Sequence, residues 1–167
     1  MKKLITLNER KATGPDKISA KLLRMVAHAI SPSLTTLFNA SLSRGCFPTE
    51  WKEANVTLIP KVGDRQIFNH HHQVSVIPAI AKVFESIVHQ QLYGYLEENG
   101  ILMEEQAGFQ PNRSTQDVLL RATDDWRKAL DFGQLVATVM IDLSKAFDTI
   151  NHDLVFVELN CCGFQII

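Results

Sequence analysis

Residues 136–148 read VATVMIDLSKAFD, and this stretch decides the fold that the sequence predicts. From Leu135 to Ile141 every residue is apolar except one threonine, and the run ends at the carboxylate of Asp142. A short apolar run rich in Val and Ile is typical of a strand that is buried on both faces. Asp142 is therefore expected where the apolar interior meets an open edge of a sheet.

The pattern leaves two interpretations of Asp142 open. A rigid carboxylate at the end of a buried strand suits a hard cation such as Mg²⁺, which takes oxygen ligands. Alternatively, Asp142 only ends the strand or accepts backbone hydrogen bonds from the turn that follows. The apolar run taken alone favours this second interpretation.

The residues that follow change the balance between the two. Residues 141–159, IDLSKAFDTINHDLVFVEL, closely resemble the first palm motif of reverse transcriptases from non-LTR (LINE-type) retrotransposons. The resemblance implies that Asp142 is one of three metal-binding carboxylates of an RNA-directed DNA polymerase, with the backbone carbonyl of Leu143 as a further metal contact. It also implies that Phe147 packs under the incoming sugar and disfavours a 2′-OH. Asp148 is expected to shape the turn before a helix that starts near Asn151.

Length, composition and net charge limit the class of protein that this sequence can be. The chain has 167 residues, 46% of them apolar, which is enough for one domain with a core. Its three cysteines have neither zinc nor disulfide spacing and are expected to be reduced. A net charge of −1 argues against strong nucleic-acid binding by the chain alone. The apolar runs are shorter than a bilayer span, and polar residues interrupt the N-terminal MKKLITL, so an intracellular protein without membrane contact is expected.

The upstream chain is predicted to be mainly helical. Asp16 is expected to cap a helix whose apolar face continues to Ile30, and Ser31-Pro32 is expected to start a second helix that ends at Gly45. Residues 56–60 alternate as in a strand, and Trp51 before them is expected to anchor the core. The strongest helical pattern runs over residues 80–100.

Further helices are predicted downstream. Ser114 and Asp117 form a capping box for a helix that continues to Leu130. The pattern predicts that this helix buries an apolar face, and its members are Val118, Leu119, Ala122, Trp126 and Leu130. A last helix is predicted over residues 153–162, ended by Gly163.

Several upstream segments resemble the same family, namely KATGPD (11–16), WKEANVTLIPK (51–61), AKVFESIVHQQL (81–92) and EQAGFQPNRSTQD (105–117). The resemblance implies that Lys61 contacts the incoming triphosphate. It places Gln110 and Arg113 near the template side, although the family usually has Arg where Gln110 stands.

Residues 69–78, NHHHQVSVIP, depart from the family pattern NYRPISLLP. His72 stands where the family has the arginine that grips nucleotide phosphates, and an imidazole cannot replace the fixed fork of a guanidinium. Nucleotide binding at His72 is therefore expected to be weakened. The run His70-His71-His72 is expected to be a loop without an ordered metal, because neighbours on an extended chain point to opposite sides.

These observations predict an α+β fold: mostly helical fingers plus the start of a reverse-transcriptase palm sheet, an incomplete right-hand polymerase. Residues 1–10 are expected to be an N-terminal leader, 11–133 a fingers-like region, and 134–167 the first palm strand and helix. The resemblance implies an RNA template, a DNA primer, deoxynucleoside triphosphates and two Mg²⁺ ions.

Activity of the chain itself is not expected. The sequence contains no Tyr/Phe-x-Asp-Asp run, and one carboxylate cannot hold two divalent ions. We therefore expect a truncated, inactive reverse-transcriptase domain that binds nucleic acid weakly or not at all. The alternative is a non-catalytic helical RNA-binding or interaction remnant of a retrotransposon. In either case uncovered apolar surface and aggregation are expected.

Overall fold

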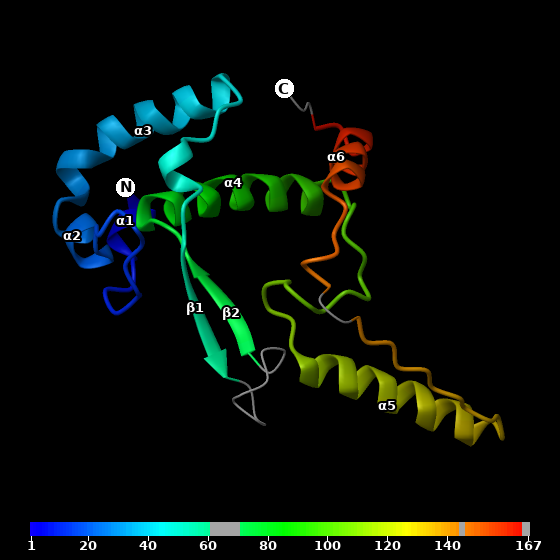
Figure 1. The fold of residues 1–167 in the computed structure, drawn as a ribbon. Helices are drawn as coiled ribbons and strands as arrows, with labels where there is room; N and C mark the ends of the chain where they lie inside the picture. Colours follow the sequence, from blue (N-terminus) through cyan, green and yellow to red (C-terminus); the bar gives the residue numbers. More distant parts are fainter. Residues whose placement is uncertain (61–70, 144–145, 165–167) are drawn as a thin grey trace. The chain divides into compact units, whose positions relative to one another are not determined.

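The structure, a computed structural model, describes residues 1–60, 71–143 and 146–164. The chain divides into two compact units, Met1–Gly94 and Tyr95–Ile166. Figure 1 labels the helices and strands. In chain order the elements are α1 (Lys2–Ile5), α2 (Ala20–Met25), α3 (Ala27–Ser43), the short 3₁₀ helix η1 (Thr49–Trp51), β1 (Asn55–Pro60), β2 (His71–Val76), α4 (Ala79–Glu98), α5 (Thr115–Asp131) and α6 (His152–Cys161). Helices with a small antiparallel sheet confirm the predicted α+β class.

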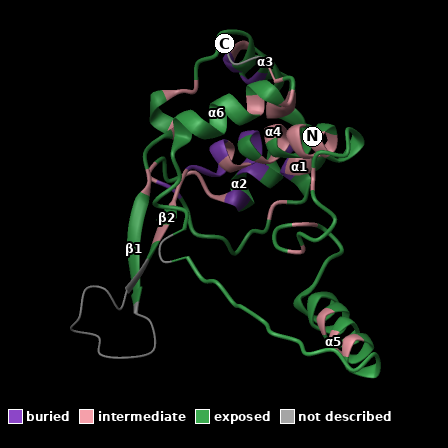
Figure 2. Cartoon of the chain, turned by 90° about the vertical axis from the view of Figure 1, so that its right-hand side faces the viewer, coloured by how far each residue is buried: buried purple, intermediate pink, exposed green. Residues whose placement is uncertain are grey.

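An aromatic cluster forms the centre of the N-terminal unit. The rings of Phe38 on α3 and Phe84 on α4 stack with centroids 4.8 Å apart. Trp51 on η1 meets Phe38 edge to face at 5.8 Å, and Phe47 contacts both Trp51 and Phe84. The core role predicted for Trp51 is confirmed. Figure 2 shows buried residues in this unit. Leu4 of α1 is also buried, at 3% exposed.

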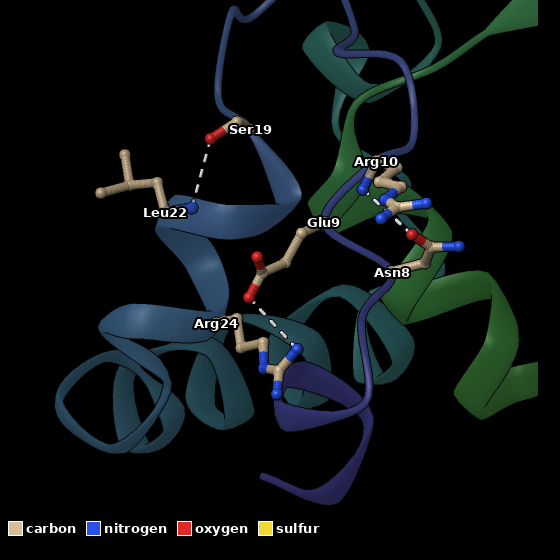
Figure 3. A network of polar contacts seen from close by, with 6 residues as sticks. All are labelled: Asn8, Glu9, Arg10, Ser19, Leu22 and Arg24. Carbon is tan, nitrogen blue, oxygen red and sulfur yellow. Dashed lines mark hydrogen bonds and ion pairs between the residues drawn. The ribbon is translucent and has the colours of Figure 1, made fainter.

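The first helix that the sequence predicted corresponds to α2, and it begins later than predicted. Ser19, not Asp16, is the N-cap of α2, because its hydroxyl accepts a hydrogen bond from the Leu22 N–H at 3.2 Å (Figure 3). Asp16 instead accepts the Ile18 N–H at 3.2 Å and closes a turn ahead of the helix.

The second predicted helix corresponds to α3, and it begins earlier than predicted, at Ala27 rather than after Ser31. Ala27 is fully buried, so tertiary packing extends α3 toward its N-terminus and leaves Pro32 inside the helix. The missing N–H of Pro32 removes one helical hydrogen bond there. The predicted end at Gly45 is confirmed: Gly45 has φ 60°, and the Cys46 N–H bonds to the Ser41 carbonyl at 3.0 Å.

The two strands pair antiparallel, with Asn55 opposite Val76 and Pro60 opposite His71. β1 was predicted from its alternating pattern and is confirmed. The loop predicted for the histidine run is wrong where the structure describes it, because His71 and His72 belong to β2. A polar run still forms a strand here because the backbone of β1 supplies its ladder partners.

The C-terminal unit has helices but no buried residue among those described. The predicted capping box of α5 is confirmed, with Ser114 and Asp117 bonded reciprocally. The predicted burial is wrong, since Val118, Leu119 and Leu130 are 47%, 63% and 64% exposed. Figure 2 accordingly shows α5 in the colours of exposed and intermediate residues. An apolar helix face is buried only where another layer covers it.

The last predicted helix is confirmed as α6, which Asn151 caps through its side-chain oxygen. It ends before Gly163, where the sequence predicted. Among the described residues, no helix combines the length and apolarity that a membrane crossing requires.

Candidate functional site

Asp142 ends an extended apolar segment that is not a strand. In the described ranges, the sheet consists of β1 and β2, and residues 134–143 have no regular structure. Leu135 is fully exposed, and Val139 and Ile141 are 82% and 83% exposed. The predicted strand, buried on both faces, is therefore wrong for this chain. Such a strand needs ladder partners and two covering layers, and the described residues supply neither.

Asp142 and Leu143 are both exposed, Leu143 to 71%. Nothing in the described part of the chain groups three or more His, Cys, Asp or Glu side chains closely enough to hold a metal ion. A two-metal centre needs several carboxylates around paired cations. The described residues thus do not form such a centre, and Asp142 is available only as a single ligand.

Phe147 lies in a turn, residues 146–149, between Asp142 and α6. The residue is 71% exposed, and its ring meets the ring of Phe109 edge to face, with centroids 5.7 Å apart and planes at 89°. Asp148 occupies the same turn, as expected. The contact joins the DLSKAFD motif to the QAGF motif, which are about forty residues apart in the sequence.

Phe109 is a residue that the sequence analysis did not single out. It is 88% exposed and has φ 60°, in the left-handed region that aromatic residues rarely adopt. Residues held in sparsely populated backbone conformations cluster at functional sites. The sequence signal for Phe109 is its place in the family motif between Gly108 and Pro111, because Gly and Pro are residues that favour turns.

Gln110 and Arg113 close the loop that carries Phe109. An Arg113 Nη1 donates to the Glu104 carbonyl at 2.6 Å, and Gln110 Nε2 donates to the Met103 carbonyl at 3.4 Å. Both side chains therefore stabilise the loop, and a guanidinium retains further donors for a ligand.

The acidic residue next to this loop has a shifted pKa. Hydrogen bonds from the Ser114 hydroxyl and backbone N–H, with a smaller effect of Arg113, hold the pKa of Asp117 below its usual value. Asp117 thus remains ionised at neutral pH and caps the first turn of α5.

The remaining predicted site residues belong to the N-terminal unit. Lys61 lies outside the described residues, as does His70. His72 lies on β2 opposite Ile59, and the structure describes its backbone only. The described site residues that belong to one unit are thus Gln110, Arg113, Asp142, Leu143 and Phe147.

Comparison with known proteins gives one consistent result. Residues 59–167 match the family model described as reverse transcriptase (RNA-dependent DNA polymerase). The chain is 28% identical over 151 residues to the "Probable RNA-directed DNA polymerase from transposon X-element" of Drosophila melanogaster, covering 89% of this chain. It is 25% identical over 144 residues to the "RNA-directed DNA polymerase from mobile element jockey" of the same organism, covering 86% of this chain. The chain spans only 16% of the length of each of these relatives.

Proposed function

The chain belongs to the reverse transcriptase (RNA-dependent DNA polymerase) family, with relatives from LINE-type, non-LTR transposons, and from this membership we propose that it forms the fingers region and first palm motif of an RNA-directed DNA polymerase. Residues 11–133 would be the fingers and residues 134–167 the first part of the palm. The observation that carries the proposal is the contact between Phe109 and Phe147, because it joins two separate family motifs in one unit.

Each motif contributes a proposed role. Asp142 supplies one carboxylate, and Leu143 a backbone carbonyl, to the Mg²⁺ site that the family implies. The exposure of Asp142 supports this role, because an exposed carboxylate can receive a cation without breaking a contact of the fold. Phe147 lies under the nucleotide sugar, and the edge-to-face contact with Phe109 limits where its ring can move.

The partners proposed for this region are an RNA template, a DNA primer and a deoxynucleoside triphosphate. Arg113 and Gln110 order the loop on the template side while they hold its backbone carbonyls. Lys61 and His72 are proposed to face the triphosphate, where a lysine acts as a point charge. His72 lacks the bidentate fork of arginine, so the triphosphate is expected to bind weakly there.

The 167-residue chain alone is expected to give no primer extension, because its described residues do not complete a metal centre. A chimaera tests the proposal: residues 1–167 replace the matching segment of the jockey polymerase, and extension of a DNA primer on an RNA template is measured. We expect the chimaera to extend the primer. Asp142→Asn should lower its rate by more than about 100-fold, since even outer-shell partners of a metal cost about 10–100-fold.

Asp148→Asn is the matched control, because it removes the same charge from the same motif in a turn. It should leave the rate within a few-fold of the unmodified chimaera. His72→Arg should lower the KM for the nucleotide, since it restores a bidentate phosphate contact. Equal activity of the Asp142→Asn and Asp148→Asn chimaeras would overturn the proposal. So would a folded His72→Arg chimaera that binds primer–template but extends nothing.

A further inference from the structure

Two adjacent cysteines end the last helix of the C-terminal unit. Cys161 is the last residue of α6, and Cys162 is its C-cap. Both thiols are free, and Cys161 is exposed whereas Cys162 is half-buried. A free cysteine in a folded protein is usually buried and packs as a small apolar side chain. Core packing therefore does not account for this pair, and its thiols are open to a ligand.

The backbone around the two cysteines has a defined conformation. The Phe164 N–H donates to the Leu159 carbonyl and the Gly163 N–H donates to the Asn160 carbonyl, each at 3.0 Å. These two bonds form the Schellman motif that commonly ends a helix. Gly163 has φ 92°, a left-handed conformation that glycine adopts without strain. The motif thus fixes the chain on both sides of the cysteine pair.

A tertiary contact within the same unit holds this turn as well. The Tyr95 hydroxyl donates to the Cys162 carbonyl at 3.0 Å, and the rings of Tyr95 and Phe164 meet with centroids 4.7 Å apart and planes at 65°. A Cβ on Gly163 would lie 2.7 Å from the Tyr95 hydroxyl oxygen, so an added side chain would force the tyrosine to shift. The backbone that carries both thiols is therefore ordered before a ligand binds, which lowers the cost of binding.

The two thiols are too close in the chain for an unstrained disulfide with each other. Neighbouring Cα atoms lie about 3.8 Å apart across a trans peptide bond, whereas the Cα atoms of a disulfide are usually about 4.4–6.8 Å apart. Across the described residues, neither sulfur has a hydrogen-bond partner. Both sulfurs are thus available together, and their short separation along the chain lets them reach one small ion.

The number of ligands decides which ion the pair can take. Mg²⁺ and Ca²⁺ take oxygen ligands, while structural zinc sites and iron–sulfur clusters take four protein ligands. In the part of the chain that the structure describes, no three His, Cys, Asp or Glu side chains gather closely enough to hold a metal ion. Soft thiolate ligands select Cu(I), which is stable with two sulfur ligands in a nearly linear arrangement. Cu(I) is therefore the ion that a site with two thiolates and no third ligand fits.

We propose that Cys161 and Cys162 bind one Cu(I) ion through both sulfurs. Each thiol loses its proton when its sulfur binds copper, so one Cu⁺ enters and two H⁺ leave to the solvent, with no change in oxidation state. The ion is distinct from the Mg²⁺ of the proposed polymerase site, because Mg²⁺ takes oxygen ligands. The two sites share no residue, so either proposal can fail without the other.

Titration of the full 167-residue chain with Cu(I) tests the proposal, under anaerobic conditions with ascorbate as reductant and bathocuproine disulfonate as the competing chelator. We expect one Cu(I) ion per chain and a sulfur-to-copper charge-transfer absorption in the ultraviolet. X-ray absorption at the copper edge should show two sulfur neighbours. Cys161→Ser and Cys162→Ser should each weaken binding by more than about 100-fold, because a direct ligand contributes more than an outer-shell partner does.

The matched control is Cys46→Ser, which removes the remaining thiol of the chain, an exposed one in the N-terminal unit. It should bind one Cu(I) ion with unchanged affinity. Zn²⁺ should not displace the copper, since the pair supplies too few ligands for a zinc site. Circular dichroism checks that all three variants keep their helices. Equal loss of affinity in Cys46→Ser and in the α6 variants, or unchanged affinity in Cys161→Ser, would overturn the proposal.

Stoichiometry distinguishes a pair within one chain from a bridge between two chains. Sedimentation velocity is measured with and without Cu(I) at the same protein concentration. One Cu(I) ion per chain, with no change in association state, supports the proposal. Half an ion per chain, together with a copper-dependent dimer, would show that each chain supplies a single thiolate, and the proposal would be wrong.

Discussion

Gly14 lies against the backbone of Ile77 and Pro78, at a distance that excludes a side chain. A Cβ at Gly14 would lie 2.7 Å from the Cα and N of Pro78 and 2.8 Å from the carbonyl carbon of Ile77. Pro78 is itself fully buried. The KATGPD segment, which resembles the family, and the end of the segment NHHHQVSVIP therefore meet through their backbones.

Gly14→Ala is expected to destabilise the N-terminal unit by about 1–3 kcal/mol, because the new methyl group forces the two backbones apart. The matched control is Gly94→Ala in α4, where an added Cβ meets nothing within 4 Å. That control should stabilise the helix by about 0.5–1 kcal/mol. Urea denaturation of both variants measures the difference. A Gly14→Ala protein as stable as the unmodified chain would show that this contact is absent in solution.

At the scale of elements, α5 owes its stability mainly to local interactions. It contains no buried residue, so its capping box and the Lys128–Asp124 pair at 2.7 Å carry much of the stabilisation. The lowered pKa of Asp117 reflects the same capping box, since the ionised carboxylate accepts the bonds from Ser114. This element resembles an isolated peptide helix more than a core helix.

The helicity of a peptide spanning residues 112–134 is therefore expected to fall in acid. A carboxyl whose pKa is lowered on folding stabilises the fold above its unfolded pKa of about 3.9, and this contribution is lost as the pH falls through the lowered value. Circular dichroism against pH measures the loss. Asp117→Asn should reduce helicity at neutral pH and weaken the acid transition.

Asp125→Asn is the control for this titration, because Asp125 lies in the same helix but takes no part in the capping box of Ser114 and Asp117. It should retain both the neutral helicity and the acid transition, to which the Lys128–Asp124 pair also contributes. If both substitutions change the titration alike, the capping box does not control it.

At the scale of the whole molecule, the two units differ in what they bury. The N-terminal unit has a core around Phe38 and Phe84, whereas none of the described residues from Tyr95 to Phe164 is buried. Residues 135–141 are uncharged, rich in β-branched residues and extended, which is the signature of a segment that pairs with other chains. Association of the purified chain through this segment is expected.

Val139→Lys should reduce this association, because a charge placed within an uncharged extended run opposes pairing between chains. Since Val139 is 82% exposed, the free energy of unfolding should change by less than about 0.5 kcal/mol. Sedimentation velocity over a range of concentrations measures the effect. Val118→Lys on α5 adds the same charge at another exposed apolar residue and should reduce association less. Strong destabilisation by Val139→Lys would mean that the run is packed within the folded chain.

Local signals predicted much of this protein. The capping box at Ser114 and the ends of helices at Gly45, Gly100 and Gly163 depend on interactions within a few residues. The alternating pattern of residues 56–60 was also enough to predict β1. The family was also readable, because residues 141–159 match a long, specific motif, and the match over residues 59–167 agrees with it. The roles proposed for Asp142, Lys61 and the other site residues remain predictions.

Contacts between distant residues decided the rest. The start of α3 depends on burial of Ala27, and β2 exists because β1 pairs with it. The contacts of Phe109 with Phe147 and of Tyr95 with Phe164 join residues far apart in the chain. The run 135–141 has the sequence of a buried strand and remains exposed. Hydrophobicity sets how favourable burial would be, whereas burial itself requires partner strands and covering layers that only the tertiary structure provides.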